Sequence, residues 1–224
     1  MLNKKIFLLV FGLVLFQLNP AQAQETKDNK KFGLGISGSY HYVPEFFLHI
    51  GLKGAHDVKA QQTGLRLLYR TTNVDVAVQF QYMQINAPDG NWLGINHDWD
   101  ETDYVEFDNL AFAFVEISAT WNTPIIENLY FIYGAGIGGG LVLGDVYTTP
   151  TMGCTSDNWD DTDQCTHLPG DVRREKEEIP RGMGMIEAIV GLRYDIIENI
   201  SLKVETGFFL PGFFKTTISA EFYY

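Results

Sequence analysis

Beyond its first sixteen residues the sequence has no long hydrophobic run. A transmembrane helix needs about 20 consecutive apolar residues, and no later segment comes close to that length. The mean hydropathy is −0.06, which is low for a helical membrane protein. Any membrane-crossing segment is therefore expected to be a β-strand, because only helices and closed barrels satisfy all backbone hydrogen bonds in lipid.

Basic residues are scarce as well. The chain has 16 Lys and Arg against 28 Asp and Glu, a formal net charge of −12, which argues against nucleic acid as a partner. Catalytic motifs such as Gly-x-Ser-x-Gly and His-Glu-x-x-His do not occur, and the five histidines are scattered. His41, Asp98 and Asp145 could converge at strand ends, but we expect no enzyme and no cofactor.

Cysteine is limited to Cys154 and Cys165, which flank an Asp-rich stretch of ten residues. In an oxidising compartment this spacing favours one loop-closing disulfide, contributing about 3 kcal/mol by the chain-entropy estimate. A metal site is the weaker interpretation, since the sequence has no second Cys pair or paired His at ligand spacing.

The N-terminus has the three parts of a secretory signal: Lys4 and Lys5, an apolar run from Ile6 to Phe16, and the small-residue site Ala21-Gln22-Ala23. We expect a signal peptide at 1–23, a periplasmic segment at 24–31 and a barrel at 32–224. An uncleaved membrane anchor is the alternative. Cleavage would change the net charge from −12 to −14, because the segment holds two lysines and no acid.

Alternating apolar and polar residues predict eight β-strands. They cover 33–43, 62–71, 74–85, 108–122, 129–145, 182–195, 199–210 and 213–224. Long links at 44–61, 86–107 and 146–181 alternate with short turns, which is typical of a transmembrane barrel. The fold class expected is an all-β, eight-stranded antiparallel up-and-down transmembrane barrel. Leu110 to Phe114 is apolar on both faces, so its register stays open.

Alternation alone does not say which face points outward, since a soluble lipocalin-like barrel alternates equally. Strand length and aromatic residues near strand ends favour an apolar exterior. The predicted aromatic girdles comprise Tyr40, Tyr42, Tyr69, Tyr82, Trp121, Tyr130, Tyr194, Phe208, Phe214 and Phe222. The opposite faces carry both signs of charge. The predicted lumen ion-pair network comprises Arg66, Arg70, Asp75, Glu116, Glu187, Arg193, Lys203, Glu205, Lys215 and Glu221.

An eight-stranded barrel is just wide enough for its own side chains, so these charges are expected to plug the lumen. The glycines between Gly134 and Gly144 leave room for long side chains, or line a narrow channel. The acidic, aromatic loops at 87–108 and 154–165 suit Ca²⁺ or carbohydrate, or are simply solvated. The apolar segment 44–50 is expected to be a short amphipathic element in the membrane interface.

The final strand ends on Phe222 and Tyr224 and resembles the closing strand of bacterial outer-membrane β-barrels, whose C-terminal pattern is recognised by the barrel-insertion machinery. Three segments look like those of small, largely uncharacterised barrel proteins of myxobacteria and related Gram-negative bacteria, with an OmpA/OmpW-like layout: 40–48, 102–108 and 133–146. The resemblance implies an outer-membrane location and contact with lipid and lipopolysaccharide. The oligomeric state stays open, and a monomer is expected. A structural or surface-interaction role is expected; the alternative is a narrow channel for small or hydrophobic solutes.

Overall fold

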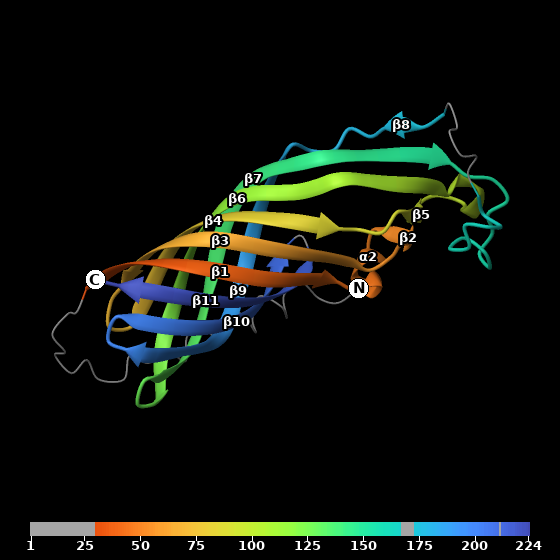
Figure 1. Cartoon of the computed structure of the whole chain (residues 1–224). Helices are drawn as coiled ribbons and strands as arrows, with labels where there is room; N and C mark the ends of the chain where they lie inside the picture. Colours follow the sequence, from red (N-terminus) through yellow and green to blue (C-terminus); the bar gives the residue numbers. More distant parts are fainter. Residues whose placement is uncertain (1–29, 167–172, 211) are drawn as a thin grey trace, which may run out of the picture.

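The computed structural model describes residues 30–166, 173–210 and 212–224. The predicted signal peptide, and nearly all of the predicted periplasmic segment, lie outside the described residues. Figure 1 shows long strands wrapped into one barrel, with additional short elements gathered at one end.

Eight strands form the wall of the barrel. They are β1 (Lys31–Val43), β3 (Val58–Arg70), β4 (Val74–Asn86), β6 (Asp103–Ile126), β7 (Leu129–Pro150), β9 (Gly182–Ile197), β10 (Ile200–Leu210) and β11 (Phe213–Tyr223). The short elements are α2 (Glu45–Leu48), β2 (Leu52–Gly54), β5 (Gly90–Gly94), the 3₁₀ helix η1 (Trp99–Glu101) and β8 (Glu175–Lys176).

Each wall strand pairs antiparallel with its neighbours in sequence, and the first strand pairs with the last. Gly33 lies opposite Tyr223 and Tyr42 opposite Phe214, so β1 and β11 are in register along their whole length. Closure leaves the wall without an unpaired edge, which is what a barrel requires in lipid. The predicted eight-stranded antiparallel up-and-down barrel is confirmed.

The two ends of the barrel differ. The turn end carries the links at 71–73, 127–128 and 198–199 and the C-terminus of the chain, and the loop end carries all the short elements. At the loop end β6 and β7 extend past the other strands (Figure 1), where Asp103 pairs with Pro150. β5 pairs with this extension of β6, β2 with β5, and β8 with β7.

The predicted bounds of these two strands, 108–122 and 129–145, were therefore too short. The extension alternates polar and apolar residues only weakly, because it lies beyond the zone in which one face is apolar throughout. A strand in this position receives its hydrogen bonds from its partner without a continuous hydrophobic face, so periodicity fails to mark its end.

The outer face of the wall is apolar and the inner face polar. One exposed apolar side chain from each wall strand illustrates this, with exposed fractions between 50% and 63%: Ile36, Leu65, Phe80, Ile117, Ile137, Ile186, Val204 and Ile218. A soluble barrel would have its polar face outside. The arrangement is the inverted one that a lipid solvent requires.

The sequence predicted two features of the exterior, the aromatic girdles and a short amphipathic element at 44–50. Tyr130 was predicted in an aromatic girdle, which is wrong: its ring lies under the guanidinium of Arg193, 4.0 Å away, so it points into the lumen. Residues 45–48 do form a short helix, α2, and Phe47 packs 5.6 Å from Phe208 and 5.3 Å from Phe214 on the outside of the wall. Within the described part of the chain, no helix has the length and apolarity to cross a membrane.

Candidate functional site: the lumen and the loop end

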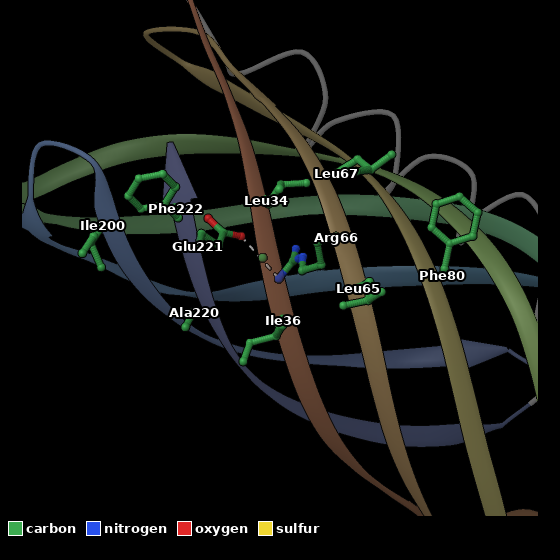
Figure 2. A pocket seen from close by; sticks show the side chains of 11 residues that line it. Leu34, Ile36, Leu65, Arg66, Leu67, Phe80, Ile200, Ala220, Glu221 and Phe222 are labelled. Atoms are coloured by element: carbon green, nitrogen blue, oxygen red, sulfur yellow. Dashed lines mark ion pairs between the residues drawn. The ribbon is translucent and has the colours of Figure 1, made fainter. Parts of the chain in front are cut away.

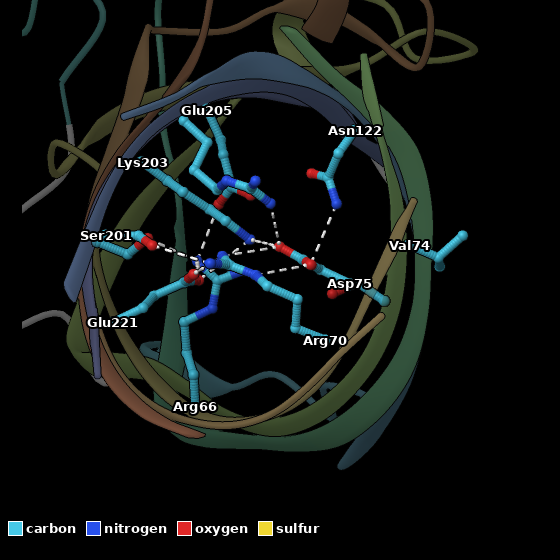
Figure 3. A network of polar contacts seen from close by, with 12 residues as sticks. Arg66, Arg70, Val74, Asp75, Asn122, Ser201, Lys203, Glu205 and Glu221 are labelled. Carbon is cyan, nitrogen blue, oxygen red and sulfur yellow. Dashed lines mark hydrogen bonds and ion pairs between the residues drawn. The ribbon is translucent and has the colours of Figure 1, made fainter. Parts of the chain in front are cut away.

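Asp75 on β4 is the centre of a polar network near the turn end of the lumen. Its carboxylate accepts hydrogen bonds from Arg70 Nε at 3.0 Å and Nη2 at 3.1 Å, and from Lys203 Nζ at 2.9 Å. Arg193 Nη1 lies at 3.2 Å and Asn122 Nδ2 at 3.1 Å. Figure 3 shows Arg70, Lys203 and Asn122 converging on Asp75 from different sides of the lumen. One carboxylate thus holds three cations in place.

Glu221 and Glu205 complete this network. Glu221 lies 3.5 Å from Arg66 Nη1, 3.2 Å from Lys203 Nζ and 3.3 Å from Arg70 Nη2. Glu205 accepts from Arg66 Nη1 at 3.0 Å. Charge-assisted hydrogen bonds of this kind are roughly twice as strong as neutral ones, so the side chains have little freedom to move apart.

A second group lies nearer the middle of the barrel. Lys215 Nζ donates to Glu187 at 2.7 Å and lies 3.8 Å from Glu116. Glu116 also accepts from Gln81 Nε2 at 2.7 Å. At the same level, His41 Nε2 shares a 2.6 Å hydrogen bond with Gln62.

All ten charged residues expected in the lumen are buried there, and the structure brings them into these two groups. Five are cationic and five anionic, so the set is formally neutral. Neutrality matters because an unpaired charge in a narrow lumen would keep a large desolvation penalty, whereas a paired one recovers it.

A third layer is apolar, and sequence analysis missed it. Six fully or nearly fully buried side chains fill the lumen on the loop side of Lys215: Ala60, Met83, Phe112, Phe114, Met185 and Phe209. Phe112 and Phe114 stack at 4.7 Å, and Phe209 packs edge-on to His41 at 5.8 Å. The only available signal was the run 110–114, apolar on both faces, whose register was ambiguous.

The glycines of β7 allow β6 to approach closely. A Cβ at Gly136 would collide with the Glu116 carboxylate, and one at Gly138 or Gly140 with backbone carbonyls of β6. These positions therefore make room for the neighbouring strand and for Glu116. Arginine side chains, which the sequence suggested as the neighbours, are not among the nearest atoms.

The loops pack into one body, the loop platform (residues 52–56, 90–101 and 151–166). The predicted disulfide between Cys154 and Cys165 is present. Asn91 Nδ2 donates to the carbonyls of Trp159 at 2.8 Å and Cys165 at 2.9 Å. The Trp159 ring covers Gly54 so tightly that a Cβ there would approach it to 2.7 Å. Three loops distant in sequence are thus joined.

The acidic residues of the platform serve mainly local structure. Asp98 and Glu101 form the capping box of η1, and Asp161 accepts from the Gln164 side chain at 2.7 Å. Across residues 30–166, 173–210 and 212–224, no group of three or more His, Cys, Asp and Glu is placed to hold a metal ion. The predicted Ca²⁺ binding has no assembled ligand set to support it.

The three residues considered for catalysis do not form a site. His41 is buried in the lumen beside Gln62, Asp98 caps η1, and Asp145 forms an ion pair with Lys176 at 2.7 Å. Each is engaged in a different structural contact.

The C-terminal residues lie as the alternation predicts. Phe222 is on the outer face and Tyr224 is 73% exposed, while Tyr223 is buried beneath Arg70. Their part in insertion stays a prediction. A shallow hollow beside them, between Leu34, Leu65 and Phe222, is lined by outward apolar side chains, whereas Arg66 and Glu221 behind it pair inside (Figure 2). It is a feature of the apolar exterior and has no polar group that could carry chemistry.

A closed antiparallel wall, apolar outside and charged inside, defines a β-barrel of the outer-membrane type. No family model matches the chain, and no curated protein matches it.

Three solved structures illustrate its similarities. Neisserial surface protein A is 10% identical with a TM-score of 0.41, over 86% of this chain and 95% of that one. Ail of Yersinia pestis is 11% identical with a TM-score of 0.39, over 89% and 100%. The N-terminal β-barrel domain of Pseudomonas aeruginosa OprF is 13% identical with a TM-score of 0.37, over 86% and 97%. Values this low support no statement about function.

Proposed function

We propose that the protein is a closed, non-enzymatic barrel of the outer membrane with a structural or surface-interaction role, and that it presents the loop platform at the cell surface. The observation that carries this proposal is the filled lumen: two groups of ion pairs, which are neutral only when taken together, and an apolar layer occupy its cross-section in series. An eight-stranded barrel has no spare width beyond its own side chains. The alternative, a narrow channel for small or hydrophobic solutes, needs a continuous path that these layers would block.

Planar-bilayer conductance tests this proposal. The unaltered protein is expected to pass no steady current. The double variant Met83→Ala/Phe112→Ala, which thins the apolar layer, serves as the comparison, and Met152→Ala in an exposed part of the platform is the matched control. A steady ohmic current through the unaltered protein would favour the channel instead.

Location is tested by heat-modifiable migration of protein taken from a washed outer-membrane fraction. A folded barrel resists detergent until it is boiled, so the unboiled sample is expected to run as a separate, faster band. Protein recovered from the soluble periplasm without such a shift would contradict the proposal. Reductant is expected to increase protease cleavage within 154–165 on intact cells, because the disulfide closes that loop, without altering the migration of the barrel.

A further inference from the structure

The loop end of the lumen contains a cavity of about 340 Å³. Its wall is formed by inward side chains from six strands: Val58, Ile85, Phe112, Val142, Met183 and Phe213. Each lies on the same face of its strand as the lumen residues described above, so the barrel wall separates this cavity from the surroundings of the barrel. We call it the apolar cup.

The apolar cup is closed at the bottom. Ile85, Val142, Met183 and Phe213 line it and also pack against the apolar layer of Met83, Phe112 and Phe209. Beneath that layer lie Lys215 and the ion pairs. A molecule entering from the loop end would therefore stop above the layer, which makes the cup a binding site and not part of a path.

The rim of the cup is aromatic. Trp92 of β5 lines the cup, and its ring packs 5.6 Å from both Phe107 and His56. Its indole Nε1 is buried, so it is not accessible from the cup. Trp92 therefore offers a ligand its apolar ring and no hydrogen-bond donor.

The volume of the cup and its lack of charged residues limit which ligands it can bind. The volume lies within the range of small-molecule sites, about 300–1,000 Å³, and at roughly 30 Å³ per water-sized group it holds about ten such groups. No residue lining the cup is charged. An ionised head group would have to give up its hydration without a partner, which is strongly unfavourable.

We propose that the apolar cup binds a free, uncharged single-chain amphiphile of about ten carbons, which enters from the loop end, places its alkyl chain in the cup and keeps its one polar group near the rim beside the Trp92 ring. This goes beyond the proposed function. The cup is blind, so its occupancy does not depend on conductance: a current through the barrel would overturn the closed-barrel proposal, and the binding test below would still decide this one.

The test uses the whole barrel in lipid nanodiscs and 2-bromodecan-1-ol, which carries its bromine beside the hydroxyl and quenches tryptophan fluorescence on contact. We expect saturable quenching of a component that disappears in Trp92→Phe. Val146→Phe and Ala87→Phe place extra volume in the cup and are expected to weaken binding at least tenfold. Val204→Phe, which adds the same volume on the outer face, is the matched control. Heat-modifiable migration verifies that each variant is folded.

Partitioning of the probe into the lipid is the competing outcome. Quenching that rises linearly with the probe and is identical in Val146→Phe, Ala87→Phe and Val204→Phe would mean that the probe only partitions into the lipid, and would overturn the proposal.

Discussion

The two halves of the lumen are filled by opposite means. Near the turn end the filling consists of charges, centred on Asp75 with three cations around it. Near the loop end it consists of side chains such as Met83 and Phe112 that offer only packing. The charged half depends on every partner being present, because removal of one leaves another buried and unpaired. The apolar half loses stability in proportion to the volume removed.

The largest effect is expected for Asp75→Asn. The change keeps the volume but leaves Arg70, Arg193 and Lys203 without their common anion. We expect the free energy of unfolding to fall by about 3–5 kcal/mol, measured by urea unfolding of the protein folded into lipid vesicles. Asp157→Asn, in the exposed part of the platform, is the control. Equal midpoints for the two variants would show that the charged half does not hold the barrel together.

Met83→Ala probes the apolar half. Met83 is fully buried, and its truncation is expected to cost about 3 kcal/mol. The loss should be independent of salt, because the truncation removes no charge. Met152→Ala is the matched control, since Met152 is 53% exposed. Strong salt dependence of the Met83 variant would mean that the two halves are not separate.

Gly138→Ala tests the close approach of β6 and β7 beside Glu116, where the two halves meet. The added Cβ would collide with the carbonyl of Val115 and lie 2.9 Å from the Cα of Glu116. Overpacking of this kind is expected to cost about 1–3 kcal/mol in the same unfolding measurement. Gly38→Ala is the control, since its Cβ would meet no atom within 4 Å and should change stability by less than about 0.5 kcal/mol.

The smallest effect is expected for an exposed aspartate. Asp57 accepts from the Tyr42 hydroxyl and the Glu45 backbone N–H, both at 2.8 Å, and the hydroxyl bond is the main cause of its lowered pKa. Because the pKa of Asp57 is lower in the folded loop, its ionised carboxylate stabilises that loop at pH values above the ordinary carboxyl pKa. This stabilisation is lost as the pH falls through the lowered pKa. Asp57→Ala should speed hydrogen exchange at the Glu45 amide and leave the unfolding midpoint of the barrel unchanged. A shifted midpoint would contradict this.

Much of the architecture was predictable because the membrane barrel repeats one rule. Side chains alternate between the two faces of a strand. Once the strand is recognised, Ile218 on the outer face therefore implies that Lys215 and Glu221 lie on the inner face. The same rule failed where the register changes. Between Asp108 and Ala111 the pairing with β7 shifts, and Asn109 has a φ of 51°, so alternation counted through this bulge reverses its faces.

The loop platform shows another limit. Two cysteines in an acidic loop predicted the disulfide, but nothing in the sequence linked Asn91 to Trp159 or Trp159 to Gly54. These contacts join residues many tens of positions apart, and no local pattern encodes them. The apolar cup escaped prediction for the same reason, since its wall takes one or two side chains from each of several strands.

The sequence by itself determined the class of fold, the number of strands and the set of charged residues on the polar faces, because strand periodicity is a local property. Only the tertiary structure decided how the lumen is divided. Closing the sheet fixes which residues of distant strands meet at the same height, and this sets Asp75 among three cations and Phe112 among other apolar side chains. The stagger between strands is a property of the whole closed barrel, and no single strand carries it.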